Sequence, residues 1–159
     1  MSYEPRLGDY GIVKTTGFFG FLIRLGTLSR WNHAFIYIGD GKIIEANPKG
    51  IQIGNVKEYS RIAWNKHDQL TPRQRKAIVD FAHNALGTPY NFLMIGNLAL
   101  RILGLKVLAK THLLYRWAQK SKGYICSELC AEAYAAAGIK IQSPDLATPG
   151  DLAERIIYL

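Results

Sequence analysis

Two residues of this sequence have the side chains and the setting of a nucleophile and its base. Cys126 begins an Ala-rich segment, residues 126–137, that Gly138 follows, and this composition predicts a helix. A thiol in the first turn of a helix faces unpaired backbone N–H groups and the positive end of the helix dipole, and both favour the thiolate that attacks carbonyl carbon. His33 begins an apolar segment rich in strand-forming residues. A cysteine at a helix start and a histidine on a strand are typical of cysteine nucleophiles.

Packing is the competing interpretation of the cysteines, because free cysteine is among the most buried residue types and behaves as a small hydrophobe. Cys130 lies one helical turn after Cys126, and we expect it in the core. Two cysteines at this spacing are too far apart on a helix for an unstrained disulfide, so two free thiols are predicted. No metal site is expected, because the four histidines are scattered and do not follow zinc-ligand spacing. No cofactor is expected either.

The composition is that of one globular domain, residues 1–159, with 48% hydrophobic and 20% charged residues. Lys and Arg number 20 against 12 acidic residues, a net charge of +8. A basic surface suits an anionic polymer such as cell wall, or an anionic membrane surface. The sequence carries no nucleic-acid-binding motif, and nothing in it indicates the oligomeric state.

No targeting or membrane segment is predicted. Residues 1–6 have no apolar core of the signal-peptide kind. Residues 91–117 are strongly apolar, but Arg101 and Lys106 interrupt them, which disfavours a membrane-spanning helix. We therefore expect a cytoplasmic protein, or one delivered by another route such as a phage particle or a secretion system.

The order of strand and helix patterns predicts an α+β fold, in which a small antiparallel sheet packs against helices. A Gly-Asp-Gly turn at residues 39–41 predicts a hairpin. Strands are expected at residues 8–14, 33–38, 42–46, 50–53 and 61–64. Helices are expected at residues 17–28, 71–86, 126–137 and from Thr148 onward.

Hairpin geometry decides which side chains can reach His33. A three-residue Gly39–Gly41 loop places Phe35 opposite Glu45, and His33 and Asn47 then lie on the same face as Glu45. A two-residue turn would shift the register and place Glu45 on the other face. Glu45 and Asn47 therefore both stay open as the polar partner of the histidine.

Several short motifs, taken in their order along the chain, resemble a known family. They are Gly8-Asp9, the His33 strand with its Gly-Asp-Gly turn, Leu86-Gly87-Thr88-Pro89-Tyr90, Tyr124-Ile125-Cys126-Ser127-Glu128-Leu129 and Thr148-Pro149-Gly150-Asp151-Leu152. The sequence resembles the circularly permuted, YiiX/LRAT-like branch of the NlpC/P60 superfamily of papain-like cysteine hydrolases. In the ordinary order of that superfamily the cysteine helix precedes the histidine strand, and here the histidine strand comes first.

The resemblance implies a permuted papain-like fold and a Cys-His-Glu triad. Cys126 would be the nucleophile, His33 the general base and Glu45 the group that orients His33, with Asn47 as the alternative. Tyr90 stands where the ordinary family carries an active-site tyrosine near the thiolate or the oxyanion; a core aromatic is the competing interpretation.

The activity implied is that of a cysteine peptidase or amidase that works through an acyl-enzyme, with peptidoglycan stem peptides as the leading substrate. A lipid-directed thiol acyl hydrolase or acyltransferase is the alternative, since the permuted branch also resembles such enzymes and residues 91–123 are expected to form an apolar, helical insertion. We expect residues 91–117 to fold back over the region between Cys126 and His33. A catalytically silent binding module of the same fold is the third possibility.

Overall fold

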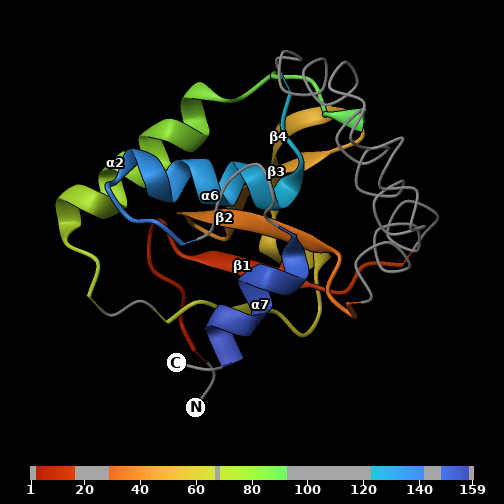
Figure 1. Ribbon diagram of the computed structural model, residues 1–159, viewed down its shortest axis with the longest axis horizontal. Helices are drawn as coiled ribbons and strands as arrows, with labels where there is room; N and C mark the ends of the chain where they lie inside the picture. Colours follow the sequence, from red (N-terminus) through yellow and green to blue (C-terminus); the bar gives the residue numbers. More distant parts are fainter. Residues whose placement is uncertain (1–2, 17–28, 67–68, 93–122, 142–147, 158–159) are drawn as a thin grey trace, which may run out of the picture.

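The computed structural model describes residues 3–16, 29–66, 69–92, 123–141 and 148–157. These residues form one five-stranded antiparallel sheet with helices packed on it (Figure 1), as the sequence predicts. The predicted helix at residues 17–28 and most of the predicted insertion at residues 91–123 lie outside the described residues. No helix in the described ranges is long and apolar enough to span a membrane.

The sheet has the strand order β4-β3-β2-β1-β5. The strands are β1 (Tyr10–Val13), β2 (His33–Gly39), β3 (Lys42–Asn47), β4 (Gly50–Asn55) and β5 (Ala63–Trp64). Strands β2, β3 and β4 are consecutive and paired with their neighbours, whereas β5 lies beside β1 at the far edge. A short 3-10 helix, η1 (Val56–Glu58), follows β4.

The β2–β3 hairpin pairs Phe35 with Glu45 through a two-residue turn combined with a β-bulge. The turn has two residues, Asp40 and Gly41, both with positive φ (52° and 69°), which is typical of a type I′ turn. Such a turn alone would put Glu45 on the opposite face, as the sequence predicts for a two-residue turn. A bulge between Tyr37 and Gly39 adds one residue to β2 and restores the pairing of Phe35 with Glu45.

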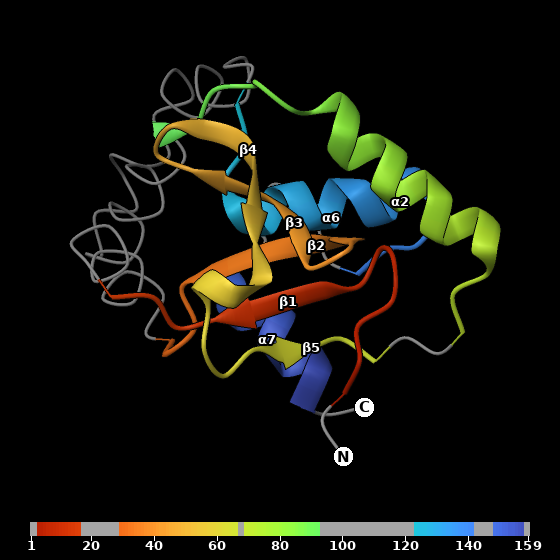
Figure 2. The same ribbon diagram turned by 180° about the vertical axis from the view of Figure 1, so that it is seen from behind.

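Among the described residues, three helices cover one face of the sheet: α2 (Pro72–Asn84), α6 (Cys126–Ala136) and α7 (Pro149–Ile157). Helix α6 packs on β2, α2 packs beside α6, and α7 packs on β1 and β5 (Figures 1 and 2). The alternate residues of the strands that face these helices form the larger core, with side chains from Tyr10, Ile12, Ala34, Ile36, Ile44 and Ala46.

The opposite face carries a smaller core of Val13, Phe35, Ile43 and Trp64. The segment from Val56 to Ile62 crosses this face and packs its apolar side chains against it. Alternate residues of a strand face the same side of the sheet, and Glu45 pairs with Phe35. The side chains of His33 and Glu45 therefore lie on the same face as this smaller core.

The helix ends follow the capping signals of the sequence. The hydroxyl of Thr71 accepts the backbone N–H of Gln74 at 3.2 Å, and the Gln74 side chain accepts the N–H of Thr71 at 3.0 Å. Thr148 and Asp151 make the same reciprocal pair at the start of α7. Gly138, with φ 77°, follows α6.

Candidate active site

Cys126 is the first residue of α6, and its side chain is buried, with 2% of its surface exposed. Ile125, before it, has an extended backbone (φ −91°, ψ 163°), and the carboxylate of Glu128 accepts the Ile125 N–H at 3.2 Å. These contacts fix the chain at the point where it enters the helix. The thiol therefore lies at the positive end of the α6 helix dipole.

His33 lies at the start of β2 and interacts with residues from two other elements. Its Nε2 is 2.6 Å from Oε2 of Glu45 in β3. Burial by itself would lower the pKa of His33, but hydrogen bonds to Cys126 and Glu45, and the negative charges of both, raise it to about 9. His33 therefore holds its proton between the side chains of Cys126 and Glu45.

Glu45 is 3% exposed and has further partners. The hydroxyl of Tyr59 donates to Glu45 Oε2 at 2.5 Å. Burial would raise the pKa of Glu45, but hydrogen bonds from His33, Tyr59 and Asn47 outweigh it, and the net shift is downward. The carboxylate is thus held ionised. Glu45, rather than the alternative Asn47, is the group on His33 Nε2, and Asn47 supports Glu45.

Gly54 of β4 leaves the space that the Glu45 carboxylate occupies. A Cβ atom at Gly54 would lie 2.9 Å from Glu45 Oε1 and 3.3 Å from the Ile43 side chain. Every larger residue would therefore push the carboxylate away from its present position. Gly54, which pairs with Ile43 of the neighbouring strand, therefore helps to determine where the Glu45 carboxylate lies.

Tyr90 lies next to the segment that precedes Cys126. It forms an isolated parallel bridge with Tyr124, supported by the hydrogen bond from the Asn91 N–H to the Tyr124 carbonyl at 3.2 Å. Burial first, and then the charge of Cys126, raise the pKa of the Tyr90 hydroxyl above its ordinary value. The structure thus brings Tyr90 close to Cys126, while its ring also packs edge-on against Phe92.

Cys130 is fully buried one turn along α6, and both cysteines are free, as predicted. Burial, followed by the charge of Cys126, raises the pKa of Cys130 well above its ordinary value. Within the described ranges, no three His, Cys, Asp or Glu side chains converge as metal ligands.

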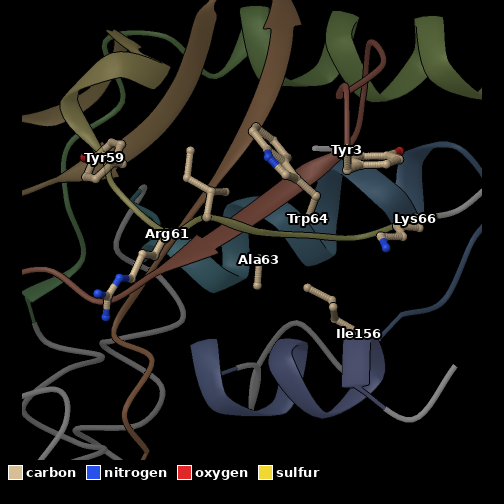
Figure 3. A pocket seen from close by; sticks show the side chains of 8 residues that line it. Tyr3, Tyr59, Arg61, Ala63, Trp64, Lys66 and Ile156 are labelled. Carbon is tan, nitrogen blue, oxygen red and sulfur yellow. The ribbon is translucent and has the colours of Figure 1, made fainter. Parts of the chain in front are cut away.

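A groove of about 540 Å³ lies at the β5 edge of the sheet, between residues of the smaller core and Ile156 of α7 (Figure 3). Tyr59 stands at one end and Lys66 at the other, with Trp64 between them. Tyr59 therefore contacts Glu45 with its hydroxyl while its ring lines this groove.

Comparisons with known proteins place this geometry in context. No family model matches the chain. Among solved structures, the crystal structure of metalloprotein yiiX (DUF1105) from Escherichia coli O157:H7 matches 89% of this chain and 71% of its own, with a TM-score of 0.63 and 18% identity. The fold is similar to that of yiiX.

Among curated proteins, the chain is similar to "Probable lipoprotein peptidase YaeF" of Escherichia coli (strain K12). The two are 26% identical over 168 residues, covering 91% of this chain and 61% of YaeF. The chain thus spans about three fifths of the length of that relative.

Sequence reasoning did not find Tyr59 or Gly54 as site residues. A usable signal for Tyr59 was the Asn55-x-x-Glu58 spacing, which predicts a capped turn directly after β4 and fixes the residue that follows it. No local signal marks Gly54, because its importance depends on a residue of the neighbouring strand.

Proposed function

We propose that this protein is a cysteine hydrolase that cleaves an amide bond through an acyl-enzyme. The observation that carries the proposal is the position of His33, which forms hydrogen bonds to both Cys126 and Glu45. The peptidase name of YaeF supports an amide as the scissile bond. The order of the motifs and the similarity to yiiX support the permuted NlpC/P60 assignment.

In the acylation step, the Cys126 thiolate attacks the carbonyl carbon of the substrate and forms a C–S bond. The tetrahedral oxyanion is stabilised by backbone N–H groups at the start of α6, that of Cys126 first. The protonated His33 then gives its proton to the leaving amine, the C–N bond breaks, and a thioester remains on Cys126.

In the deacylation step, neutral His33 takes a proton from water, and the resulting hydroxide attacks the thioester carbonyl. The C–S bond breaks, the carboxylic acid leaves, and the Cys126 thiolate and the His33 imidazolium are restored. Glu45 stabilises the imidazolium form in both steps and forms no bond to the substrate. Tyr90, beside the thiolate, is placed to contact the substrate carbonyl.

Peptidoglycan stem peptides are the substrate class that we propose. The net charge of +8 is compatible with binding to an anionic polymer or an anionic membrane surface. A lipid ester or thioester, cleaved by the same thiol chemistry, is the alternative substrate class.

The test is incubation of the protein with purified peptidoglycan and, separately, with phospholipid vesicles, followed by mass spectrometry of the products. Cys126→Ala serves as the control in both arms. Release of stem-peptide fragments with a new amine and a new carboxylate supports the proposal. Release of fatty acid instead would replace the substrate class. If neither product forms, and no acyl adduct of Cys126 is found by intact mass, the hydrolase assignment is wrong and a binding module remains.

A further inference from the structure

Tyr59 reaches Glu45 from a segment whose backbone is held in place by its own hydrogen bonds. In η1, the Asn55 side chain accepts the Lys57 N–H at 2.9 Å, and Glu58 accepts the Asn55 N–H at 3.0 Å. The Val56 N–H donates to the Gly41 carbonyl at 2.8 Å, which ties the turn to the β2–β3 hairpin. Tyr59 follows directly, so the position of its ring is set by the hairpin that carries His33 and Glu45.

The ring of Tyr59 is held as firmly as its backbone. It stacks on Phe35 with centroids 5.2 Å apart and planes at 22°, and it lies 5.6 Å from the His33 ring. The stack limits the rotation of the ring and points the hydroxyl at Glu45. The Tyr59 hydroxyl and His33 Nε2 then share one acceptor, Oε2 of Glu45, at 2.5 and 2.6 Å.

Sharing one oxygen has two physical consequences. First, Glu45 cannot rotate away from His33 without also losing the hydrogen bond from Tyr59. Second, the hydroxyl draws part of the negative charge of the carboxylate, which weakens its attraction for the imidazolium. A neutral donor at this place therefore fixes the direction of the carboxylate and weakens the attraction of the carboxylate for the imidazolium.

We propose that Tyr59 is a positioning residue that holds Oε2 of Glu45 toward His33 and limits how strongly Glu45 retains the proton of His33. This inference rests on the proposed function for its catalytic meaning, but its geometry can be tested without a substrate. Burial, then the hydrogen bond and the charge of Glu45, raise the pKa of Tyr59 far above its ordinary value, so the hydroxyl remains a donor throughout the working pH range.

Several groups face the pair formed by Glu45 and His33 and affect its titration. Cys126 of α6 approaches His33, Asn47 of β3 donates to Glu45, and the charge of Glu58 in η1 acts on Tyr59. Each of these is unchanged in Tyr59→Phe, which removes only the hydroxyl and keeps the ring that stacks on Phe35. The variant thus isolates the effect of one hydrogen bond.

The experiment is an NMR titration of the His33 ring in the whole protein, with the signal assigned from His33→Gln. In Tyr59→Phe the midpoint should move upward by about half a pH unit, because the full charge of Glu45 then acts on the imidazolium. Incorporation of 3-fluorotyrosine at position 59, whose hydroxyl is a stronger donor, should move it downward. Tyr37→Phe is the matched control, because the Tyr37 hydroxyl accepts the Gly41 N–H at 3.3 Å, in the hairpin turn and not at Glu45.

A midpoint that is the same in wild type, Tyr59→Phe and the fluorinated protein would overturn the inference, and so would an equal shift in Tyr37→Phe. Once a substrate is in hand, Tyr59→Phe should lower kcat several-fold with little change in KM, since positioning acts on the reaction step. Because the titration uses no substrate, a failure of the proposed function would leave its result intact, and the two hypotheses can be rejected separately.

Discussion

Two cysteines one helical turn apart differ in their surroundings but hardly in their exposure. Cys126 is 2% exposed and Cys130 is 0% exposed. Cys126 lies at the helix start and forms a hydrogen bond to His33, whereas burial raises the pKa of Cys130. A difference in their reactivity would therefore report chemical activation and not access.

We expect iodoacetamide at pH 7.5 to modify Cys126 at least about 100-fold faster than Cys130, because the thiolate is the reactive form. Peptide mapping of a time course measures both rates in one sample. His33→Ala should bring the Cys126 rate down toward that of Cys130. Equal labelling of the two thiols in the folded protein would contradict the assignment of Cys126 as the nucleophile.

The raised pKa of His33 also predicts how stability depends on pH. Its value of about 9 in the folded protein lies above the ordinary 6.5, so the native state binds this proton more tightly than the unfolded chain does. The resulting stabilisation, on the order of 3 kcal/mol at most, is fully present below pH 6.5 and is lost as the pH rises through 9.

The difference in Tm between wild type and His33→Gln should accordingly be several degrees larger at pH 6 than at pH 9.5. Thermal unfolding followed by circular dichroism measures it. His83→Gln, at an exposed position on α2, is the control and should show no such trend. A Tm difference that stays constant over this range would show that the proton on His33 is not linked to folding.

At the scale of the elements, the missing side chain at Gly54 of β4 leaves the space in which the Glu45 carboxylate of β3 lies. Replacing Gly54 with Ala puts a methyl group 2.9 Å from Glu45 Oε1. Alanine is otherwise favourable in a strand compared with glycine, so stability should change little. The carboxylate must move, however, and a displacement of about 1 Å should lower turnover roughly tenfold or more.

Measurement of kcat and of Tm on the same preparation separates the two effects. Ile53→Ala, which changes a half-exposed side chain on the same strand, is the matched control for activity. If Gly54→Ala kept full activity, the position of the Glu45 carboxylate would not matter for the reaction.

Sequence patterns predicted the elements better than the contacts between them. The Thr71–Gln74 capping box and the Gly138 helix end are local signals, and both appear in the structure. The pairing of Phe35 with Glu45 was predicted, but by a three-residue loop, because a bulge leaves no mark in the residue types of β2. Tyr59 was missed for a similar reason: its partner lies two elements away, and no periodicity links them.

At the scale of the whole molecule, a buried ion pair joins the N-terminal segment to helix α2. Asp9 is fully buried and accepts from Arg75 at 2.8 Å, from the Tyr3 hydroxyl at 2.7 Å and from the Arg6 N–H at 2.8 Å. The sequence assigned no role to Asp9, since its main partner is 66 residues away. Its carboxylate attaches α2 to the strand that follows Asp9.

We expect Asp9→Ala to lower the free energy of unfolding by roughly 3 kcal/mol, because it leaves a partly buried guanidinium and two other donors without their acceptor. Asp80→Ala is the matched control. It removes the exposed Lys76–Asp80 pair of the same helix, and its cost should be within about 0.5 kcal/mol. Urea unfolding of the two variants measures both losses in the free energy of unfolding. Losses of similar size would contradict a stabilising role of the buried Asp9 cluster.

The order of the strands in the sheet was beyond sequence reasoning. The strands after β1 could be expected to pair in sequence, as β2, β3 and β4 do. That β5 returns to the opposite edge beside β1 follows from the path of residues 56–62 over the smaller core, where Tyr59 and Ile62 pack. This path depends on side chains of four strands at once and cannot be read from any one segment.

The bulge in β2 has a consequence for chain-length variation. Ile38 is the residue that the bulge adds, so a chain lacking it could join Tyr37 directly to Gly39 and still pair Phe35 with Glu45. An insertion between Phe35 and Tyr37 without a matching one in β3 would instead turn Glu45 toward the larger core, where a carboxylate is costly to bury. A deletion at Ile38 should therefore be tolerated, whereas an insertion a few residues earlier should be rejected.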